Sequence, residues 1–426
     1  MKKQIVTAVF LLLFVSFVSF AQNGREKVLN PITRIAGAYC SYESDSVPTY
    51  KRTPAPEGYV PFYISHFGRH GSRYMGSDRD YDSVNKVMQQ ASDDGVLTIL
   101  GEKLMMQVDT VCRDARGLAG ELTPRGVREH RGVAERMYES FPQVFEKGGY
   151  IESRSTNVVR CILSMSAFDE RLKEFNPSLN ISRESSKRNM WYMADYSHRD
   201  SMKREIRHVV DSVENYTVHP ERLISSIFAD PKWVKVNIKD ESKFMISLWR
   251  MAADMQDVDY LGIDLFPYFT DEELYECFSV QNLNMYLYCG NTKRFGKYVK
   301  EDIRPLLENI IETADQVIKD SSQIATLRFG HDVNVTPLAM LMGLESDSVA
   351  VEVEDLNKVA GIWQSSIITP MCSNIQIIFF RNMKDRDDII IKILRNEKEA
   401  GIPIKTDVFP YYHWKDARAY FIKQLN

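Results

Sequence analysis

The segment Phe67–Tyr74 reads Phe-Gly-Arg-His-Gly-Ser-Arg-Tyr and places one histidine between two arginines. An imidazole can attack phosphorus as a nucleophile, and guanidinium groups offer planar pairs of donors that match phosphate oxygens. His70 is therefore a candidate nucleophile, with Arg69 and Arg73 as candidate phosphate ligands. Because a short Arg-His-Gly motif also occurs by chance in solvated turns, the surrounding elements must decide between the two interpretations.

The residues before this segment, Tyr59–His66, are mostly apolar and typical of a buried strand. His70 would then lie where a strand ends and a loop begins, which is where open α/β sheets carry their active sites. This position favours a catalytic role over a solvated turn. His66 has no comparable context and is interpreted as structural.

A second pair of reactive side chains, His331 and Asp332, directly follows the strand predicted over Gln323–Phe329 and its glycine. Thr336 and Pro337 predict the start of the next helix, which would leave the pair in a loop at the end of a strand. An aspartic acid kept neutral by burial beside a histidine could protonate the leaving oxygen of a phosphate ester. On its own, such a pair more often only ties a loop together.

A third basic side chain, Arg160, falls in the first turn of a helix predicted over Val158–Lys173, with Ser155 or Thr156 as its cap. The start of a helix attracts phosphate through its free amide groups, so Arg160 is a candidate phosphate ligand. The alternative is an ordinary exposed helix arginine. The neighbouring Cys161 is interpreted as a core residue rather than a nucleophile.

Strand-like and helical patterns alternate at the two ends of the chain, whereas the middle is helical in character. This arrangement predicts an α/β fold with a central, mostly parallel sheet flanked by helices. Residues 22–184 and 321–426 would form the catalytic α/β domain, and residues 185–320 an inserted helical lid. Further strands are expected at Tyr150–Ser153, Ser373–Phe380 and Asp388–Leu394. Further helices are expected at Tyr81–Ser92, Lys103–Cys112, Lys239–Met255, Asp271–Cys289, Tyr298–Ile318 and Trp414–Leu425, and one begins at Pro124 with Thr123 as its cap.

The N-terminus has the pattern of a secretory signal peptide over residues 1–21. Lys2 and Lys3 precede an apolar run, Ile5–Phe20, and small residues stand at Ser19 and Ala21. The run is short for a membrane span, so a membrane anchor is the weaker alternative. The mature protein is expected to be exported, to the periplasm or beyond, without a membrane partner. The net charge of −4 gives no indication of nucleic-acid binding.

The six cysteines are widely spread and lack the close spacing of metal ligands. An exported protein can form disulfides, but six cysteines allow 15 pairings and the sequence does not choose among them. Cys277 and Cys289 are the nearest pair and the first to test. The remaining cysteines are Cys40, Cys112, Cys161 and Cys372.

These motifs together resemble those of the histidine acid phosphatases, the branch of the histidine phosphatase superfamily that includes phytases and multiple inositol polyphosphate phosphatases. Residues 69–73 match the Arg-His-Gly-x-Arg signature of that family, and Gly330-His331-Asp332 matches its His-Asp motif. Leu122-Thr123-x-x-Gly126 and Arg160-x-x-x-Ser164-x-Ser166-Ala167 also resemble family landmarks. The likeness runs from about residue 60 to residue 380.

The resemblance implies a phosphoglycerate mutase-like fold and hydrolysis through a phosphohistidine on His70, with Asp332 as the proton donor. The phosphoryl oxygens would be held by Arg69, Arg73, Arg160 and His331. The residues themselves agree with this mechanism, because flanking arginines disfavour the imidazolium and keep His70 nucleophilic. No metal or cofactor is expected, since guanidinium groups can neutralise the developing charge.

The expected substrate is a small phosphate ester. The residues of segment 183–208 give an indication of which phosphate ester it is. It carries a surplus of basic residues that could attract a multiply phosphorylated ring such as phytate, with Lys187 and Arg188 as candidate substrate ligands. The alternative is a solvated helix face with ordinary charge pairs. Other functions remain open: a broad acid or sugar phosphatase, or a noncatalytic phosphate-binding protein.

Overall fold

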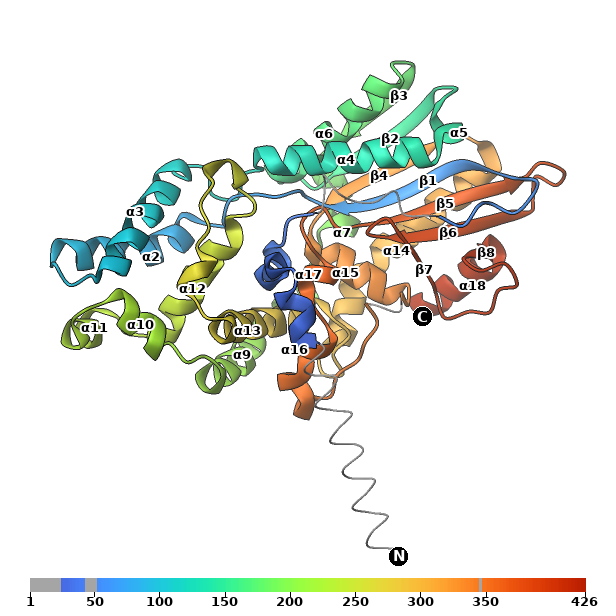
Figure 1. Ribbon diagram of the computed structural model, residues 1–426. Helices are drawn as coiled ribbons and strands as arrows, with labels where there is room; N and C mark the ends of the chain where they lie inside the picture. The colour runs from blue at the N-terminus through green and yellow to red at the C-terminus, as the bar shows by residue number, and fades with distance from the viewer. Residues whose placement is uncertain (1–23, 43–51, 345–346) are drawn as a thin grey trace, which may run out of the picture.

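The computed structural model describes residues 24–42, 52–344 and 347–426, so the predicted signal peptide lies outside the described residues. Eight strands of the described chain form one sheet in the order β3-β2-β4-β1-β5-β6-β7, with β8 also pairing with β6 (Figure 1). The strands are β1 (Tyr59–Arg69), β2 (Gly149–Ser155), β3 (Leu179–Glu184), β4 (Ala325–Gly330), β5 (Asn374–Asn382), β6 (Ile389–Arg395), β7 (Lys398–Ala400) and β8 (Tyr411–His413). Each strand predicted from the sequence is confirmed, within a few residues at its ends.

The sheet is mixed, and its parallel half carries the motifs. The neighbours β3, β2, β4 and β1 are parallel, whereas β5 to β8 join by antiparallel pairing. The predicted α/β fold with mostly parallel central strands is confirmed. Parallel strands need crossover connections, and long helical segments supply them here.

Helices cover both faces of the sheet, because alternate strand residues point to opposite sides. Tyr63 and Phe67 of β1 pack on one side, and Ile64 on the other. The first face is covered by α14 (Gly296–Asp320), α15 (Asp332–Leu341) and α18 (Trp414–Leu425). The second is covered by α4 (Pro124–Ser140), α5 (Pro142–Phe145) and α6 (Val159–Phe175). Figure 1 shows these two layers below and above the sheet.

A second apolar core lies beside the sheet, in the helical region at the left of Figure 1. Its main helices are α2 (Asp78–Asp93), α3 (Ile99–Asp114), α9 (Lys203–Thr217), α10 (Glu221–Ile227), α11 (Pro231–Asn237), α12 (Glu241–Asp254) and α13 (Asp271–Cys289). The N-terminal η1 (Ile32–Tyr39), α16 (Val359–Ile362) and α17 (Ser365–Ile368) complete it. None of the helices in the described ranges is long and apolar enough to cross a membrane.

Short helices connect these elements. They are η2 (Lys187–Asn189), α7 (Met190–Met193), α8 (Ser197–Asp200), η3 (Asp259–Leu261), η4 (Phe266–Tyr268) and η5 (Val353–Lys358).

The packing differs from the predicted domain boundaries at two places. The helices α2 and α3, expected in the α/β domain, pack into the helical core because their apolar faces meet α10 and α12. Helix α14, expected in the lid, instead packs on the sheet side with α15 and α18. The helical region is therefore built from several chain segments rather than from residues 185–320 alone.

The pair named as the first to test for a disulfide, Cys277 and Cys289, is not bridged. Both residues lie on α13, twelve positions apart, and a rise of about 1.5 Å per residue separates them by roughly 18 Å. A disulfide needs Cα atoms within about 7 Å of each other. Cys277 and Cys289 are both buried, unbridged thiols.

Two buried histidines, His66 on β1 and His130 on α4, make the stability of the fold sensitive to acid. His66 and His130 pack in an aromatic cluster with Phe168 and Phe329. Burial lowers the pKa of each histidine to about 3. In the unfolded chain these histidines bind a proton below a pKa of about 6.5, whereas the folded protein keeps them neutral to a lower pH. The free energy of unfolding therefore falls as the pH drops from about 6.5 toward the folded pKa.

We therefore expect His130→Phe to gain stability over the wild type as the pH is lowered from 7.5 to 4.5. The upper bound of the gain is about 1.4 kcal/mol per pH unit below 6.5. Urea unfolding at both pH values measures it, and His208→Gln at an exposed histidine is the control. An equal difference from the wild type at the two pH values would contradict the expectation.

Candidate active site

The carboxyl ends of the parallel strands bring the three predicted segments together. Arg69, the last residue of β1, is paired in register with Gly330, the last residue of β4. The backbone continues this pairing beyond the strands: His70 N–H donates to Gly330 O at 2.9 Å, and Thr156 N–H donates to Phe329 O at 2.9 Å. The histidine loop, the His-Asp pair and the start of α6 therefore lie at one edge of the sheet.

His70 is held in the form that a nucleophile needs. Its Nδ1 lies 2.9 Å from Gly71 O, and because a carbonyl can only accept, Nδ1 carries the proton and Nε2 keeps its lone pair. The side chain is almost completely buried. Burial, followed by the charges of Arg69 and Arg160, lowers the pKa of His70 well below its usual value. The expected influence of the arginines is thus confirmed, with burial as the larger cause.

Arg69 is fixed from three directions. Its Nη1 donates to Ala38 O and Thr369 O, both at 2.7 Å, and its Nη2 pairs with Asp332 Oδ2 at 2.9 Å. Its Nε is buried without a hydrogen-bond partner among the described residues. Buried donors are seldom left unpaired, so this atom is available to an acceptor that enters the site.

Arg73 and Arg160 extend the same cationic cluster around His70. The Arg160 Nη1 donates to Gly120 O at 3.3 Å, while its Nε is buried without a partner in the part of the chain that the structure describes. The Arg73 guanidinium lies over the ring of Tyr39, 5.4 Å from the centroid. The charges of all three arginines act on His70 and lower its pKa, and their role as phosphate ligands stays a prediction.

The predicted cap of α6 is wrong. The helix begins at Val159 with Val158 at its cap position and no side-chain cap, and Arg160 is its second residue. Thr156, one of the two expected caps, instead places its Oγ1 3.2 Å from Nε2 of His331. The uncapped amide groups leave the positive end of the helix facing the cluster.

The His-Asp pair does not lie in a loop as predicted, because α15 begins earlier than Thr336. His331 is the cap residue and Asp332 the first helical residue, so Pro337 lies inside the helix. A proline in this position cannot donate to the carbonyl four residues before it, Val333 O. The buried Arg199 donates to that oxygen from Nη1 at 2.6 Å, which explains how the helix tolerates the proline.

Asp332 is not held neutral in the structure, contrary to the expectation. Burial is the largest single influence and would raise the pKa of this carboxyl, but the Arg69 guanidinium at 2.9 Å, the charge of His331 and the hydrogen bond from Val333 N–H together hold the pKa below its usual range. The carboxylate is therefore ionised while it pairs with Arg69. A proton can reside on it only when that pairing weakens.

His331 stands directly against the nucleophile, with its ring 5.5 Å from the His70 ring in a T-shaped arrangement. Burial, and then the charge of Arg160, lower the pKa of His331. Cys161 Sγ lies 3.7 Å from Nε2 of His331, and burial raises the pKa of its thiol to about 11. Cys161 is completely buried, and its interpretation as a core residue rather than a nucleophile stays a prediction.

Two glycines allow the helix α4 to lie against the histidine loop. A Cβ at Gly71 would come within 2.5 Å of Gly126 O, and a Cβ at Gly126 within 2.3 Å of Ser72 O. Thr123 Oγ1 caps α4 at Gly126 N–H as predicted and also bonds Ser72 O at 3.0 Å. This contact explains why Thr-x-x-Gly accompanies the Arg-His-Gly motif.

Two buried acidic residues that the sequence did not predict, Glu129 and Asp257, lie behind this loop. Glu129 accepts from Ser72 N–H at 2.7 Å, from Ser72 Oγ–H at 2.8 Å and from Tyr42 N–H at 2.8 Å. Asp257 lies beside the same loop. The helical spacing of Glu129 from Gly126, on one face of a capped helix, could have indicated Glu129. No signal marked Asp257, which comes from the distant helical region.

The basic segment after β3 is partly neutralised. Arg188 is 80% exposed and pairs with Glu184 at 2.7 Å, and Lys187 is exposed. Arg183 pairs with Asp169, and Arg199 is completely buried against Asp302. Arg183, Arg188 and Arg199 therefore serve local ion pairs, and a substrate role for Lys187 and Arg188 stays a prediction.

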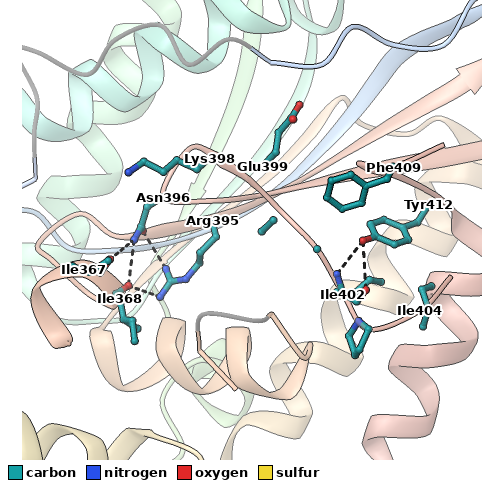
Figure 2. Close-up of a pocket in the computed structure, with 13 residues that line it drawn as sticks. Ile367, Ile368, Arg395, Asn396, Lys398, Glu399, Ile402, Ile404, Phe409 and Tyr412 are labelled. Atoms are coloured by element: carbon teal, nitrogen blue, oxygen red, sulfur yellow. Dashed lines mark hydrogen bonds between the residues drawn. The ribbon is translucent and has the colours of Figure 1, made fainter. Parts of the chain in front are cut away.

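A surface pocket of about 620 Å³ lies elsewhere, between the β6–β7 turn and residues 401–412 (Figure 2). Ile402, Ile404 and Phe409 line one end of it. At the other end the polar side chains serve the fold, since Arg395 and Asn396 both donate to Ile368 O. None of the predicted site residues lines this pocket. In the described ranges, no group of three or more potential metal ligands is placed to hold an ion.

Comparison with known proteins agrees with this geometry. The sequence model of the family described as histidine phosphatase superfamily (branch 2) matches residues 68–396. The chain belongs to this family. The matched range includes six predicted site residues: Arg69, His70, Arg73, Arg160, His331 and Asp332.

The histidine phosphatase fold extends over nearly the whole chain. A multiple inositol polyphosphate phosphatase from Bifidobacterium longum, solved in complex with inositol hexasulfate, superposes with a TM-score of 0.76 at 18% identity, covering 89% of this chain and 96% of that one. The phytase from D. castellii superposes with a TM-score of 0.66 at 15% identity, covering 92% and 85%.

Among curated proteins, multiple inositol polyphosphate phosphatase 1 of Gallus gallus is 22% identical in an alignment of 296 positions that covers 65% of this chain. The match spans 64% of the length of the chicken protein.

Proposed function

We propose that this phosphatase hydrolyses myo-inositol polyphosphates such as phytate through a covalent phosphohistidine on His70. The observation that carries the proposal is the hydrogen bond from Nδ1 to Gly71 O, which directs the lone pair of Nε2 among the three arginines. An imidazole that is buried, neutral and surrounded by phosphate-binding groups is poised for nucleophilic attack.

In the first step, Nε2 of His70 attacks phosphorus and the bond from phosphorus to the ester oxygen breaks. Arg69, Arg73 and Arg160 bind the phosphoryl oxygens, and the unpaired Nε atoms of Arg69 and Arg160 find their acceptors there. His331, packed against His70, contributes a further donor. The guanidinium groups stabilise the charge that develops in the transition state.

Asp332 supplies the proton for the leaving alkoxide. A phosphate dianion bound to Arg69 competes with the carboxylate for that guanidinium, which weakens the 2.9 Å pairing and raises the pKa of Asp332. Substrate binding thereby loads the acid with its proton. In the second step water attacks the phosphohistidine, the carboxylate accepts the proton of the water, and inorganic phosphate leaves with His70 neutral again.

The proposed substrate class is supported by the relatives, one of which was solved with an inositol hexasulfate. The basic residues beyond the first phosphate site, with Lys187 and Arg188 as candidates, would hold further phosphates of the ring. The signal-peptide pattern of residues 1–21 places the reaction outside the cytoplasm in this proposal.

Incubating the purified protein with phytate and with glucose 1-phosphate, without added metal, tests the proposal. We expect strong phosphate release from phytate between acid and neutral pH. Preference for the sugar ester would favour the broad-phosphatase alternative, and release from neither would favour a phosphate-binding protein. The His70→Ala variant, prepared in parallel, reports any contaminating phosphatase.

Replacing Arg160 by alanine is expected to reduce kcat/KM on the order of 100-fold or more, because one phosphate ligand and its charge are lost. Arg160→Lys should recover only part of the loss, since an ammonium group cannot match the planar pair of donors. Steady-state kinetics with a chromogenic phosphomonoester measures both variants. Equal activity of Arg160→Ala and the wild type would remove Arg160 from the site.

A further inference from the structure

The peptide group between Gly71 and Ser72 lies between the nucleophile and a buried carboxyl group. On one side its carbonyl oxygen lies 2.9 Å from Nδ1 of His70. On the other side its N–H donates to Oε2 of Glu129 at 2.7 Å. A peptide group is planar, and in the trans form its C=O and N–H point in opposite directions. Glu129 and His70 are therefore linked through one rigid unit of the backbone.

The carboxyl group of Glu129 has a fixed place. The residue lies on α4 and is completely buried. Its Oε1 accepts from Tyr42 N–H at 2.8 Å and from Ser72 Oγ–H at 2.8 Å. The Nε of Arg125, four residues earlier, lies 3.7 Å from Oε1. Because both oxygens accept from backbone N–H groups, the carboxyl group cannot turn without losing a buried hydrogen bond.

The histidine loop needs such an anchor because residue 71 is a glycine. A Cβ there would come within 2.5 Å of Gly126 O, so the helix α4 can approach only a glycine. Glycine has the widest choice of backbone angles, and the peptide group that follows it can turn over at little steric cost. A turned-over peptide would direct its N–H at Nδ1 of His70. The ring proton would then lie on Nε2, which removes the lone pair that attacks phosphorus.

We propose that Glu129 is a positioning residue of the nucleophile, which keeps the Gly71–Ser72 peptide in the orientation that fixes the Nδ1–H tautomer of His70. The inference rests on the proposed role of His70 as the nucleophile. In a turned-over peptide the Gly71 carbonyl would face the buried carboxyl oxygens of Glu129, acceptor against acceptor. The Ser72 N–H would lose its buried partner at the same time. Glu129 thus acts on the imidazole as the aspartate of a serine protease triad does, with a peptide group between them.

The tautomer of His70 can be observed in the full chain labelled with ¹⁵N at its eight histidines. Two-bond proton–nitrogen correlation spectra distinguish protonated from unprotonated ring nitrogens, and the spectrum of His70→Ala identifies the signals of His70. We expect Nδ1–H in the wild type. In Glu129→Met, which offers the Ser72 N–H no oxygen acceptor, we expect the Nε2–H form to appear.

The kinetics separate positioning from a merely structural role. We expect kcat of Glu129→Met with a chromogenic phosphomonoester to fall about 10- to 100-fold with little change in KM, since the arginines still bind phosphate while the reactive tautomer is scarce. The loss should match the fraction of His70 that keeps Nδ1–H. The matched control is Glu135→Met, at a partly exposed position of the same helix that pairs with Arg171. It should keep both the tautomer and kcat.

An unchanged tautomer in Glu129→Met would overturn the proposal, even if kcat falls, because Glu129 would then only support the fold. Finding Nε2–H on His70 of the wild type would overturn it as well. Should Glu129→Met not fold, Glu129→Gln decides. An amide offers one oxygen where Ser72 N–H and Tyr42 N–H each bind a different one, so the same two changes should appear in weaker form, and their absence would count against the proposal. The spectra require no substrate, so failure of phytate hydrolysis alone would not affect their result.

Discussion

His70→Ala is expected to lower phosphate release from any phosphomonoester by roughly 10⁴-fold or more, because the proposed nucleophile is lost. The neighbouring His331 is engaged with Thr156 through Nε2, and the raised pKa of Cys161 keeps it a thiol. The measurement is initial velocity with a chromogenic phosphomonoester at saturating substrate. His208→Ala at an exposed histidine is the matched control.

Rapid acid-free quenching during turnover should also trap phosphate on the wild-type protein and not on His70→Ala. A phosphoramidate bond is stable in base and labile in acid, so the stability of the label identifies the residue type. Normal turnover by His70→Ala, or an acid-stable label, would contradict the mechanism. Loss of turnover with a retained label would assign the nucleophile elsewhere.

Asp332→Asn is expected to act according to the leaving group. For an inositol phosphate, whose alkoxide leaves poorly, the rate should fall by about 10²- to 10⁴-fold, since the proton donor is lost. For p-nitrophenyl phosphate, whose phenolate leaves readily, the fall should be much smaller. Parallel kcat measurements with the two esters give the ratio that decides.

The pH dependence of the hydrolysis rate gives a second test of the Asp332→Asn variant. In the wild type, hydrolysis of the inositol ester should decline as the pH rises, because phosphate-bound Asp332 must carry its proton. Asp332→Asn should lose this decline. Equal effects of the substitution on both esters would indicate that Asp332 only orients Arg69, with which it pairs at 2.9 Å.

The parts of the site that follow from local pattern were predictable. The apolar run before Phe67 and the one before Gly330 locate two strand ends, and parallel pairing brings strand ends together. The boundaries of the helices were less predictable. The start of α15 was placed too late because Thr336-Pro337 has the local form of a helix start. In the structure the helix continues through Pro337, since Arg199 donates to the carbonyl that the proline leaves without a donor.

Other parts could not be predicted because the contacts are remote in sequence or involve only backbone. Ala38 and Thr369 bind Arg69 through carbonyl groups, which every residue possesses. Asp257 is separated from Ser41 by 216 residues. The ionised state of Asp332 required the distance to Arg69, which sequence spacing does not give.

The two hydrogen bonds from Arg69 to the carbonyl groups of Ala38 and Thr369 also affect the order of folding. The guanidinium joins carbonyl groups 31 residues before it and 300 residues after it, so the phosphate site is complete only when both distant segments have docked. Contacts with such large sequence separation form late, because the loops that they close cost chain entropy first. A phosphate ion should therefore recognise only the fully assembled chain, and by mass action its presence would shift the population toward that state and away from partly folded forms.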